Sequence, residues 1–349
     1  MKEGVKFSNS HFAHDVFGFI AHTDGCHVLC FDISNFFDRL STDVLKKKWA
    51  QVLGGETLPD DHFKVYESLV DFRYVEEGQL IENFRGKFAR NPRQHGFDWA
   101  SGGSLTHRIC SYSELRAVKR DVAAQGQHLI QRKDALGITG IPQGTAISGL
   151  LSNIFMIDFD MAIKLYIDSI GGFYRRYSDD ICIIVPTTVA FTQVEDYVQQ
   201  QLEKNCTSSI ALNHTKTEKK IYQNTENHPV VVDSQNNQLS VIQYLGFYFD
   251  GKHVFIRNST VSKDRGKIVR LVKQHKKGMR RINTLKVYKQ RSPRVITPYD
   301  VRKHKWFVYY TERAASVHDL AETILAQVKK NGRFINRAIL RERMRKSKR

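Results

Sequence analysis

The sequence predicts an α+β fold in which helices cover one face of an antiparallel sheet, and three observations support this. Short apolar runs rich in β-branched and aromatic residues have the length of strands. Longer stretches repeat apolar residues with helical spacing. Between residues 28 and 257 these segments follow one another as strand, helix, hairpin, helix and strand. That order is typical of α+β domains, where an antiparallel sheet carries its helices on one side.

Length and composition indicate a globular protein. The 349 residues are enough for two or three packed units, and 41% of them are hydrophobic and 26% charged. No window of about 18 apolar residues occurs and the first residues lack the apolar region of a signal peptide, so we expect a cytoplasmic protein without a membrane partner. The five cysteines are scattered, which predicts reduced thiols and no zinc site.

The net charge of +18 is concentrated toward the C-terminal end. Residues 261–349 hold 27 Lys and Arg against 6 Asp and Glu, which gives +21 and leaves −3 for the first 260 residues. Aromatic residues are interspersed in this basic region. The asymmetry predicts a nucleic-acid-binding face beside a nearly neutral body.

The first predicted strand ends in an acid, Asp32, after the apolar run that starts at Val28. A helix is expected after it, beginning at Thr42-Asp43 and ending at Gly54-Gly55. The spacing predicts that Leu45, Trp49 and Val52 form its apolar side. A second helix is expected over residues 61–74, and its apolar side is expected to consist of Phe63, Tyr66, Leu69 and Val70.

Two further helices are expected before the central hairpin. The first spans residues 103–125. Gly and Pro mark a loop at residues 137–144, and the second helix follows it and ends at Gly171-Gly172. The spacing predicts that its apolar stripe is buried in the core. This stripe consists of Ile147, Leu150, Leu151, Ile154, Ile157, Met161 and Leu165.

The hairpin at residues 173–185 carries two adjacent acids, Asp179 and Asp180, at its polar tip. Adjacent carboxylates repel one another unless a cation lies between them. An exposed acidic turn is the alternative for this pair alone. If Asp32 joins them, the three acids can hold two Mg²⁺ ions about 4 Å apart for phosphoryl transfer.

The remaining segments alternate between strands and helices. A helix is expected over residues 188–204, and residues 230–232 and 239–242 are expected to pair as a hairpin. A second hairpin is expected at residues 244–256, because Asp250-Gly251 suits a type I′ turn. From Ser262 onward the pattern is helical and basic.

Five short motifs, in this order, resemble the palm of reverse transcriptases. They are Phe31-Asp-Ile-Ser-Asn-Phe-Phe-Asp38, Pro142-Gln-Gly144, Tyr177-Ser-Asp-Asp180, Leu212-Asn-His-Thr-Lys-Thr217 and Tyr244-Leu-Gly-Phe247. The serine after Tyr177 and the short chain are more similar to bacterial members, of retron-like, group II intron-like or phage-defence type. The resemblance implies a polymerase right-hand palm at residues 28–257 with partial fingers in an insert at 55–139. An abbreviated segment at 1–27 precedes the palm, and a basic helical thumb at 258–349 follows it.

The resemblance implies an RNA-directed DNA polymerase of a bacterial system, with a role in antiviral defence. Its cofactor would be Mg²⁺, as two ions, with Mn²⁺ as a substitute. It would take dNTPs and an RNA template, with a dedicated non-coding RNA as one option, and produce DNA. Two alternatives remain open: a template-independent or protein-primed DNA polymerase of the same fold, and a catalytically weak nucleic-acid-binding subunit of a polymerase complex.

The resemblance also assigns roles to individual residues. Asp32, Asp179 and Asp180 would bind the metal ions together with the Ile33 carbonyl, and Lys216 would protonate the leaving pyrophosphate. Phe37 would be a steric gate that excludes a 2′-hydroxyl, beside further nucleotide contacts from Asn35, Phe36, Gln143 and Gly144. The primer and nucleic-acid contacts would be Tyr177, Tyr244, Leu245, Gly246, Lys263, Arg265, Lys267 and Arg270.

Only 31 residues precede Asp32, fewer than the family's fingers region requires. We therefore expect a homo-oligomer or a second chain that supplies the missing surface. A basic segment at residues 83–93 is a second source of triphosphate contacts, because Lys and Arg alternate there with Phe. A solvated loop is the alternative for this segment, whose basic residues are Arg85, Lys87, Arg90 and Arg93.

Overall fold

In a computed structural model, the chain forms two compact units. It describes residues 8–76, 78–79, 112–126, 128–133, 137–207, 210–275, 301–318, 322–327, 330, 334 and 337, with the main chain alone at 267–275 and 301–308. The first unit is drawn from Met1–Ser34, Asp158–Lys204 and Ala211–Arg349. The second is drawn from Asn35–Ile157 and Asn205–Ile210. The chain therefore leaves the first unit after β1 and returns to it within helix α8.

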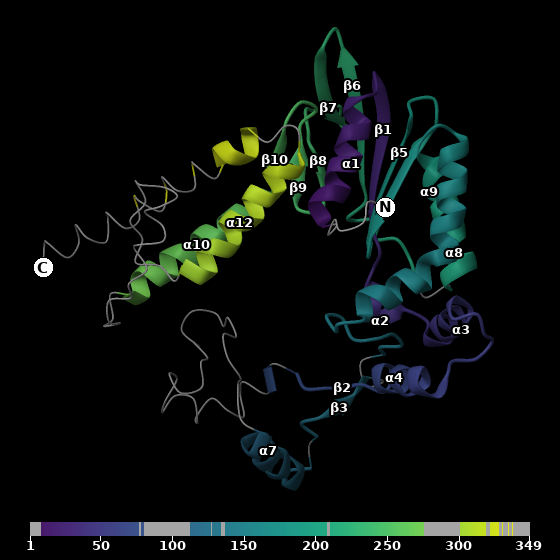
Figure 1. Ribbon diagram of the computed structural model, residues 1–349, viewed down its shortest axis with the longest axis vertical. Helices are drawn as coiled ribbons and strands as arrows, with labels where there is room; N and C mark the ends of the chain where they lie inside the picture. Colours follow the sequence, from purple (N-terminus) through teal and green to yellow (C-terminus); the bar gives the residue numbers. More distant parts are fainter. Residues whose placement is uncertain are drawn as a thin grey trace, which may run out of the picture. The chain divides into compact units, whose positions relative to one another are not determined.

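The first unit is built on a five-stranded antiparallel sheet (Figure 1). Its strands are ordered β4-β5-β1-β6-β7, so β1 lies at the centre between β5 and β6. This confirms the predicted antiparallel sheet. The strands are β1 (Gly25–Asp32), β4 (Phe173–Tyr177), β5 (Asp180–Pro186), β6 (Glu218–Thr225) and β7 (His228–Asp233).

Helices α8 (Ser148–Ser169) and α9 (Phe191–Cys206) cover one face of this sheet (Figure 1). Tyr174 on β4 donates a hydrogen bond to Asp160 of α8, and Lys219 on β6 forms an ion pair with Glu195 of α9. Both strand residues lie in register with Leu29, which is fully buried. The predicted helical layer is therefore present.

The other face of the sheet is covered by a different set of elements. They are α1 (Asn9–Ala21), the three-stranded sheet β8 (Ile242–Tyr244), β9 (Phe247–Phe249) and β10 (Val254–Ile256), and α12 (Val301–Val317). Phe17 of α1 stacks on Phe249, and Phe19 stacks on Phe173, with ring centroids 5.2 and 4.7 Å apart. Helix α10 (Asn258–His275) follows β10, so the predicted helical region after Ser262 is confirmed as far as His275.

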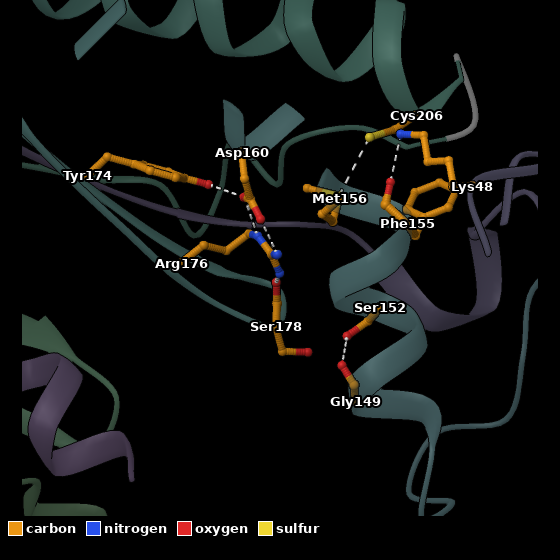
Figure 2. Close-up of polar contacts among 10 residues, drawn as sticks. All are labelled: Lys48, Gly149, Ser152, Phe155, Met156, Asp160, Tyr174, Arg176, Ser178 and Cys206. Carbon is orange, nitrogen blue, oxygen red and sulfur yellow. Dashed lines mark hydrogen bonds and ion pairs between the residues drawn. The ribbon is translucent and has the colours of Figure 1, made fainter. Parts of the chain in front are cut away.

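The second unit contains short helices and one small sheet. Its elements are α2 (Phe36–Arg39), α3 (Thr42–Val52), α4 (Asp60–Val70), β2 (Arg73–Tyr74), α7 (Tyr112–Ala124) and β3 (Gln131–Arg132). The buried Lys48 of α3 donates to the carbonyl oxygens of Phe155 and Asn205 at 2.8 and 3.0 Å (Figure 2 shows the first). These bonds satisfy a charge that would otherwise be costly to bury.

Several helical predictions need correction. Val52 is 54% exposed, because α3 ends at that residue. Helix α4 ends at Val70 instead of Tyr74, since Tyr74 joins β2, which pairs with β3. In α8 the residues Leu150, Met161 and Leu165 are 62%, 67% and 75% exposed and not in the core. This helix is apolar around much of its circumference, so the spacing alone selected a side that is only partly buried. Leu151 and Ile154 are buried as predicted, and the buried side continues through Phe155, Phe159, Ile163 and Ile167.

The hairpin predictions also change. Strand β7 pairs with β6 across the turn at Glu226-Asn227, and only the single bridge Val232↔Leu239 remains of the predicted hairpin. The first half of the hairpin expected at residues 244–256 belongs to two strands, β8 and β9, because Leu245 and Gly246 form a turn with φ values of 47° and 90°. Two positive φ values are the signature of a type I′ turn. The loop between β9 and β10 has four residues, so it is not a two-residue Asp-Gly turn.

Two predicted features lie outside the described residues. They are the basic segment with Arg85, Lys87, Arg90 and Arg93, and the start of the helix expected at 103–125, whose described part is α7. Among the helices in the described ranges, none is long and apolar enough to cross a membrane.

The junction of α8 and β4 yields a stability prediction. A methyl group at Gly172 would lie 2.5 Å from the Ile184 carbonyl oxygen, whereas one at Gly18 would meet nothing within 4 Å. Gly172→Ala is therefore expected to lower the free energy of unfolding by about 2 kcal/mol. Gly18→Ala in helix α1 should raise it by about 0.5–1 kcal/mol. Urea unfolding of both variants measures the two shifts, and equal shifts would contradict the packing described for Gly172.

Candidate active site

The three predicted acids lie at the same end of strands β1 and β5. Strand β1 ends at Asp32 and β5 begins at Asp180, and the register places these two residues directly opposite one another. The N–H of Ile33 donates to the carbonyl oxygen of Asp179 at 3.3 Å, which fixes the hairpin tip against the end of β1. Residues that are far apart in sequence are thus neighbours because of the sheet register.

Asp32 and Asp180 lie on the same face of the sheet. Tyr177, Asp180 and Asp32 lie in one row across β4, β5 and β1. Because successive side chains alternate between faces, this row shares its face with Cys30 and Cys182. That face is the one covered by α1, and Phe12 of α1 packs edge-to-face against Tyr177 with ring centroids 5.4 Å apart. Tyr177 is 43% exposed, so its ring remains accessible.

Asp32 is held by the segment at residues 212–217. Its Oδ2 accepts hydrogen bonds from Lys216 Nζ at 3.0 Å and from Asn213 Nδ2 at 3.4 Å. The N–H of Asn213 donates to the Asp32 carbonyl oxygen at 2.8 Å, and Leu212 bridges to Ile33. This fourth motif therefore lies beside the acids. Asn213 was missed as a contact, although it belongs to the motif itself.

The environment raises the pKa of Asp180 to about 6. The largest cause is the loss of surrounding water, even though the residue as a whole is exposed at the sheet end. The negative charges of Asp179 and Asp32 act in the same direction, while Lys216 and Arg257 partly offset them. Three acids that repel one another across so short a span favour a bound cation.

The chemistry of these donors suits a divalent ion. Carboxylate and carbonyl oxygens are the ligands that Mg²⁺ prefers, and one or two carboxylates with substrate phosphates often complete its shell. The residues available are Asp32, Asp179 and Asp180, with the main chain of Ile33 between them. In the described part of the chain, no three His, Cys, Asp or Glu side chains converge closely enough to enclose a metal ion by themselves.

The predicted nucleotide contacts belong to the second unit. Phe36 is buried and packs against Phe37 and Phe155, so Phe36 is the core residue of the pair. Phe37 is only partly buried, and its carbonyl oxygen accepts from the N–H of Ile141 at 3.0 Å. Asn35 is exposed with a φ of 48°. The structure thus brings Phe37 to the loop that carries the Pro-Gln-Gly motif.

That loop is exposed and anchored at both ends. Gly140 packs on the main chain of Phe37, where a side chain would not fit, since a Cβ would lie 1.8 Å from the carbonyl oxygen. Ser148 Oγ donates to the carbonyl oxygen of Pro142 at 2.6 Å. Between these anchors Gln143 and Gly144 are exposed, and Gly144 has a φ of 87° that glycine tolerates.

The fifth motif forms the turn between β8 and β9. Tyr244 is 3% exposed and belongs to the core. Leu245 and Gly246 form the turn itself, and Asn9 of α1 donates to the Leu245 carbonyl oxygen at 3.1 Å. The accessible part of this motif is therefore the turn and not the tyrosine ring.

The basic candidates after β10 are described only in part. Lys263 is exposed on α10, and the guanidinium of Arg265 lies 5.0 Å from the ring centroid of Phe334. The side chains of Lys267 and Arg270 lie outside the described atoms, although their main chain belongs to α10.

The raised pKa of Asp180 predicts a stability cost that depends on pH. Between pH 3.8, the ordinary value, and about 6, the folded state binds more protons than the unfolded state. The free energy of unfolding therefore falls as pH rises through this window. Asp180→Asn should stabilise the metal-free protein at neutral pH and have little effect below pH 3.8. Urea unfolding in EDTA at both pH values checks this, with Asp168→Asn, an exposed α8 residue, as the control.

In a comparison with known proteins, residues 123–249 match the family model "Reverse transcriptase (RNA-dependent DNA polymerase)". No curated protein matches the chain. Among solved structures, apo telomerase from Candida Tropicalis aligns at 17% identity and a TM-score of 0.37, over 70% of this chain and 35% of that one. Telomerase from Candida albicans with a fragment of telomeric RNA aligns at 15% identity and a TM-score of 0.38, over 93% of this chain and 51% of that one.

The chain thus spans between a third and about half of the length of these structures. The family match includes the exposed loop at Gln143, the hairpin with Asp179 and Asp180, and the segment with Lys216, and it begins after Asp32. Residues 123–249 are therefore the part of the chain that is similar to reverse transcriptases.

Proposed function

We propose that the chain is an Mg²⁺-dependent RNA-directed DNA polymerase that adds dNTPs to a primer 3′-hydroxyl. The observation that carries this proposal is the register of β1 and β5, which sets Asp32 opposite Asp180 beside the hairpin tip. Asp32, Asp179, Asp180 and the Ile33 carbonyl would hold two ions, with Mn²⁺ as a substitute. When bound, such ions lower the pKa of the attacking hydroxyl and neutralise the leaving pyrophosphate.

The chain's own residues contribute charge and orientation at this site. Asp32 is oriented by Asn213 and by its ion pair with Lys216. The Lys216 side chain is 63% exposed, so it can turn from Asp32 toward an anionic leaving group. We assign to it the protonation of pyrophosphate, a role for which a lysine is chemically suited.

Nucleotide selection is assigned to the second unit. The partly buried Phe37 would lie under the sugar, and Phe36 would support it from the core. Asn35, Gln143 and Gly144 are exposed and can contact the incoming nucleotide or the template. A Gln side chain both donates and accepts hydrogen bonds, and Gly lets a main chain approach closely.

Primer and template contacts are assigned to Tyr177, to the Leu245-Gly246 turn, which the buried Tyr244 supports, and to the basic residues of α10. The strongly positive charge of residues 261–349 supports this assignment, because phosphate contacts come mainly from Lys and Arg. On this basis residues 28–257 are proposed as the palm with an insert at 55–139, and residues 258–349 as the thumb. The bacterial origin, the antiviral role and the assembly with a further chain stay predictions.

The proposal predicts that replacing either Asp32 or Asp179 strongly slows DNA synthesis. Purified protein with Mg²⁺, dNTPs and a primed RNA template should extend the primer, and Asp179→Asn or Asp32→Asn should slow extension by at least about 100-fold. Asp168→Asn, which removes an exposed carboxylate paired with Lys164, is the matched control and should leave the rate unchanged. Full activity in both acid variants would contradict the proposal.

The alternatives give different products in the same assay. A template-independent or protein-primed polymerase would extend without added RNA, or would leave DNA attached to the protein, and product sequencing with and without RNase separates these cases. A catalytically weak subunit would bind nucleic acid but neither Mg²⁺ nor dNTPs.

The placement of Phe37 predicts sugar selectivity. Phe37→Val removes the ring that would clash with a 2′-hydroxyl, so ribonucleotide incorporation should rise by about tenfold or more relative to dNTP incorporation. Phe63→Val, which shortens another partly buried phenylalanine of the second unit, should leave this ratio unchanged. Single-nucleotide kcat/KM values for dNTP and rNTP measure it, and an unchanged ratio in Phe37→Val would assign Phe37 to the core alone.

A further inference from the structure

The turn that carries Asp179 has a strained main chain. Tyr177 pairs with Asp180, so only Ser178 and Asp179 connect β4 to β5. The φ angle of Ser178 is 60°, which lies in the left-handed region that glycine adopts most readily. Because a Cβ atom disfavours this conformation, a serine there needs support from its surroundings.

That support comes from Arg176, two residues before the serine. Its Nη1 donates to the Ser178 carbonyl oxygen at 2.8 Å (Figure 2). The rest of the guanidinium forms a bidentate pair with Asp160 of α8, from Nε to Oδ1 at 2.7 Å and from Nη2 to Oδ2 at 2.5 Å. The Arg176 side chain is only 5% exposed. A buried, bidentate guanidinium is fixed in direction, so the bond to Ser178 is fixed too.

Asp160 is itself held in place by a second donor. Tyr174 Oη donates to Asp160 Oδ1 at 2.6 Å, and this tyrosine lies on the same strand as Arg176 (Figure 2). Burial alone would lower the pKa of Arg176, but the hydrogen bonds and the charge of Asp160 outweigh it and raise that pKa. The arginine therefore stays charged, and one network joins α8, β4 and the turn before Asp179.

The neighbouring arginine provides a contrast. Arg175 also belongs to β4, but its guanidinium pairs with Asp15 of α1 at 3.2 Å and donates to the Tyr174 carbonyl oxygen. Successive strand residues face opposite sides, so Arg175 lies on the face of α1 and Arg176 on the face of α8. Of these two arginines, Arg176 is the one that bonds the turn.

We propose that Arg176, held by Asp160, is a positioning residue that fixes the Ser178-Asp179 turn and thereby the carboxylates of Asp179 and Asp180 for metal binding and nucleotidyl transfer. The effect of Arg176 on the rate of nucleotidyl transfer rests on the proposed function. Its effect on the affinity of the acids for a metal ion does not, because that affinity can be measured without DNA synthesis. A residue that orients metal ligands from behind is expected to change both affinity and rate.

The test compares Arg176→Lys with Arg175→Lys, since both variants keep the positive charge and lose the planar guanidinium group. Mn²⁺ binding to the protein alone is measured by electron paramagnetic resonance, and primer extension gives kcat and KM. In Arg176→Lys, Mn²⁺ affinity should fall about tenfold and kcat about 10- to 100-fold, with KM for dNTP nearly unchanged. Arg175→Lys should match the parent in all three. Circular dichroism at the assay temperature tests whether both variants are folded.

A second substitution separates positioning from general structural damage. Glycine accepts a φ of 60° without support. The double variant Arg176→Lys/Ser178→Gly should therefore bind Mn²⁺ at least about threefold more tightly than Arg176→Lys alone. If Arg176→Lys is unfolded, Asp160→Asn replaces it and should weaken Mn²⁺ binding at least threefold. Unchanged Mn²⁺ affinity in a folded Arg176→Lys or Asp160→Asn variant would overturn the inference. Parent protein that binds Mn²⁺ but makes no DNA would instead contradict the proposed function.

Discussion

The antiparallel pairing of β1 with β5 is the constraint on which the rest of the site depends. It sets Asp32 opposite Asp180, two acids whose charges repel, beside the buried residues Ile181 to Val185 of β5. Like charges directly opposite one another destabilise a sheet. The opposed acids therefore lower the free energy of unfolding when no cation is bound, and a bound cation would offset this loss. A shift of one residue would turn Asp32 to the opposite face and separate the pair.

The surrounding structure keeps this pair in place from several directions. The 212–217 segment holds Asp32 through Asn213 and Lys216. The Arg176–Asp160 pair ties the hairpin tip to α8, and Asn9 ties the Leu245-Gly246 turn to α1. The second unit meanwhile joins Phe37 to the Gln143 loop through main-chain hydrogen bonds. Each unit therefore assembles its own group of motifs from distant parts of the sequence.

The sequence predicted the features that depend on local pattern. The hairpin at 173–185, the strand before Asp32 and the helices α3, α8 and α9 follow from apolar periodicity and from Gly and Pro punctuation. The misplaced features depend on tertiary contacts. Leu150, Met161 and Leu165 are apolar yet exposed, because a helix that is apolar on several sides does not reveal which side meets the sheet. Tyr74 joins a strand because β3 pairs with it.

At the site, the acids were predictable from motifs, whereas their supports were not. Arg176 is one of two adjacent arginines in the aromatic strand β4, and Asp160 is an acid in the mostly apolar helix α8. Nothing in the local pattern shows which arginine faces α8, so the pair was not predictable. Phe36 was predicted as a nucleotide contact beside Phe37, but its packing against Phe155 identifies it as a core residue. The α1 helix was missed, although its buried residues Ala13, Val16, Phe17 and Ile20 have the spacing of a helix face.

The most direct test of the central claim is a double-mutant cycle on metal binding. Mn²⁺ affinity is measured for the parent protein, Asp32→Asn, Asp180→Asn and the double variant. If the two acids bind the same metal centre, their effects should be non-additive, with a coupling of about 1 kcal/mol or more. Effects that add to within about 0.3 kcal/mol would show that Asp32 and Asp180 act independently and would contradict the account.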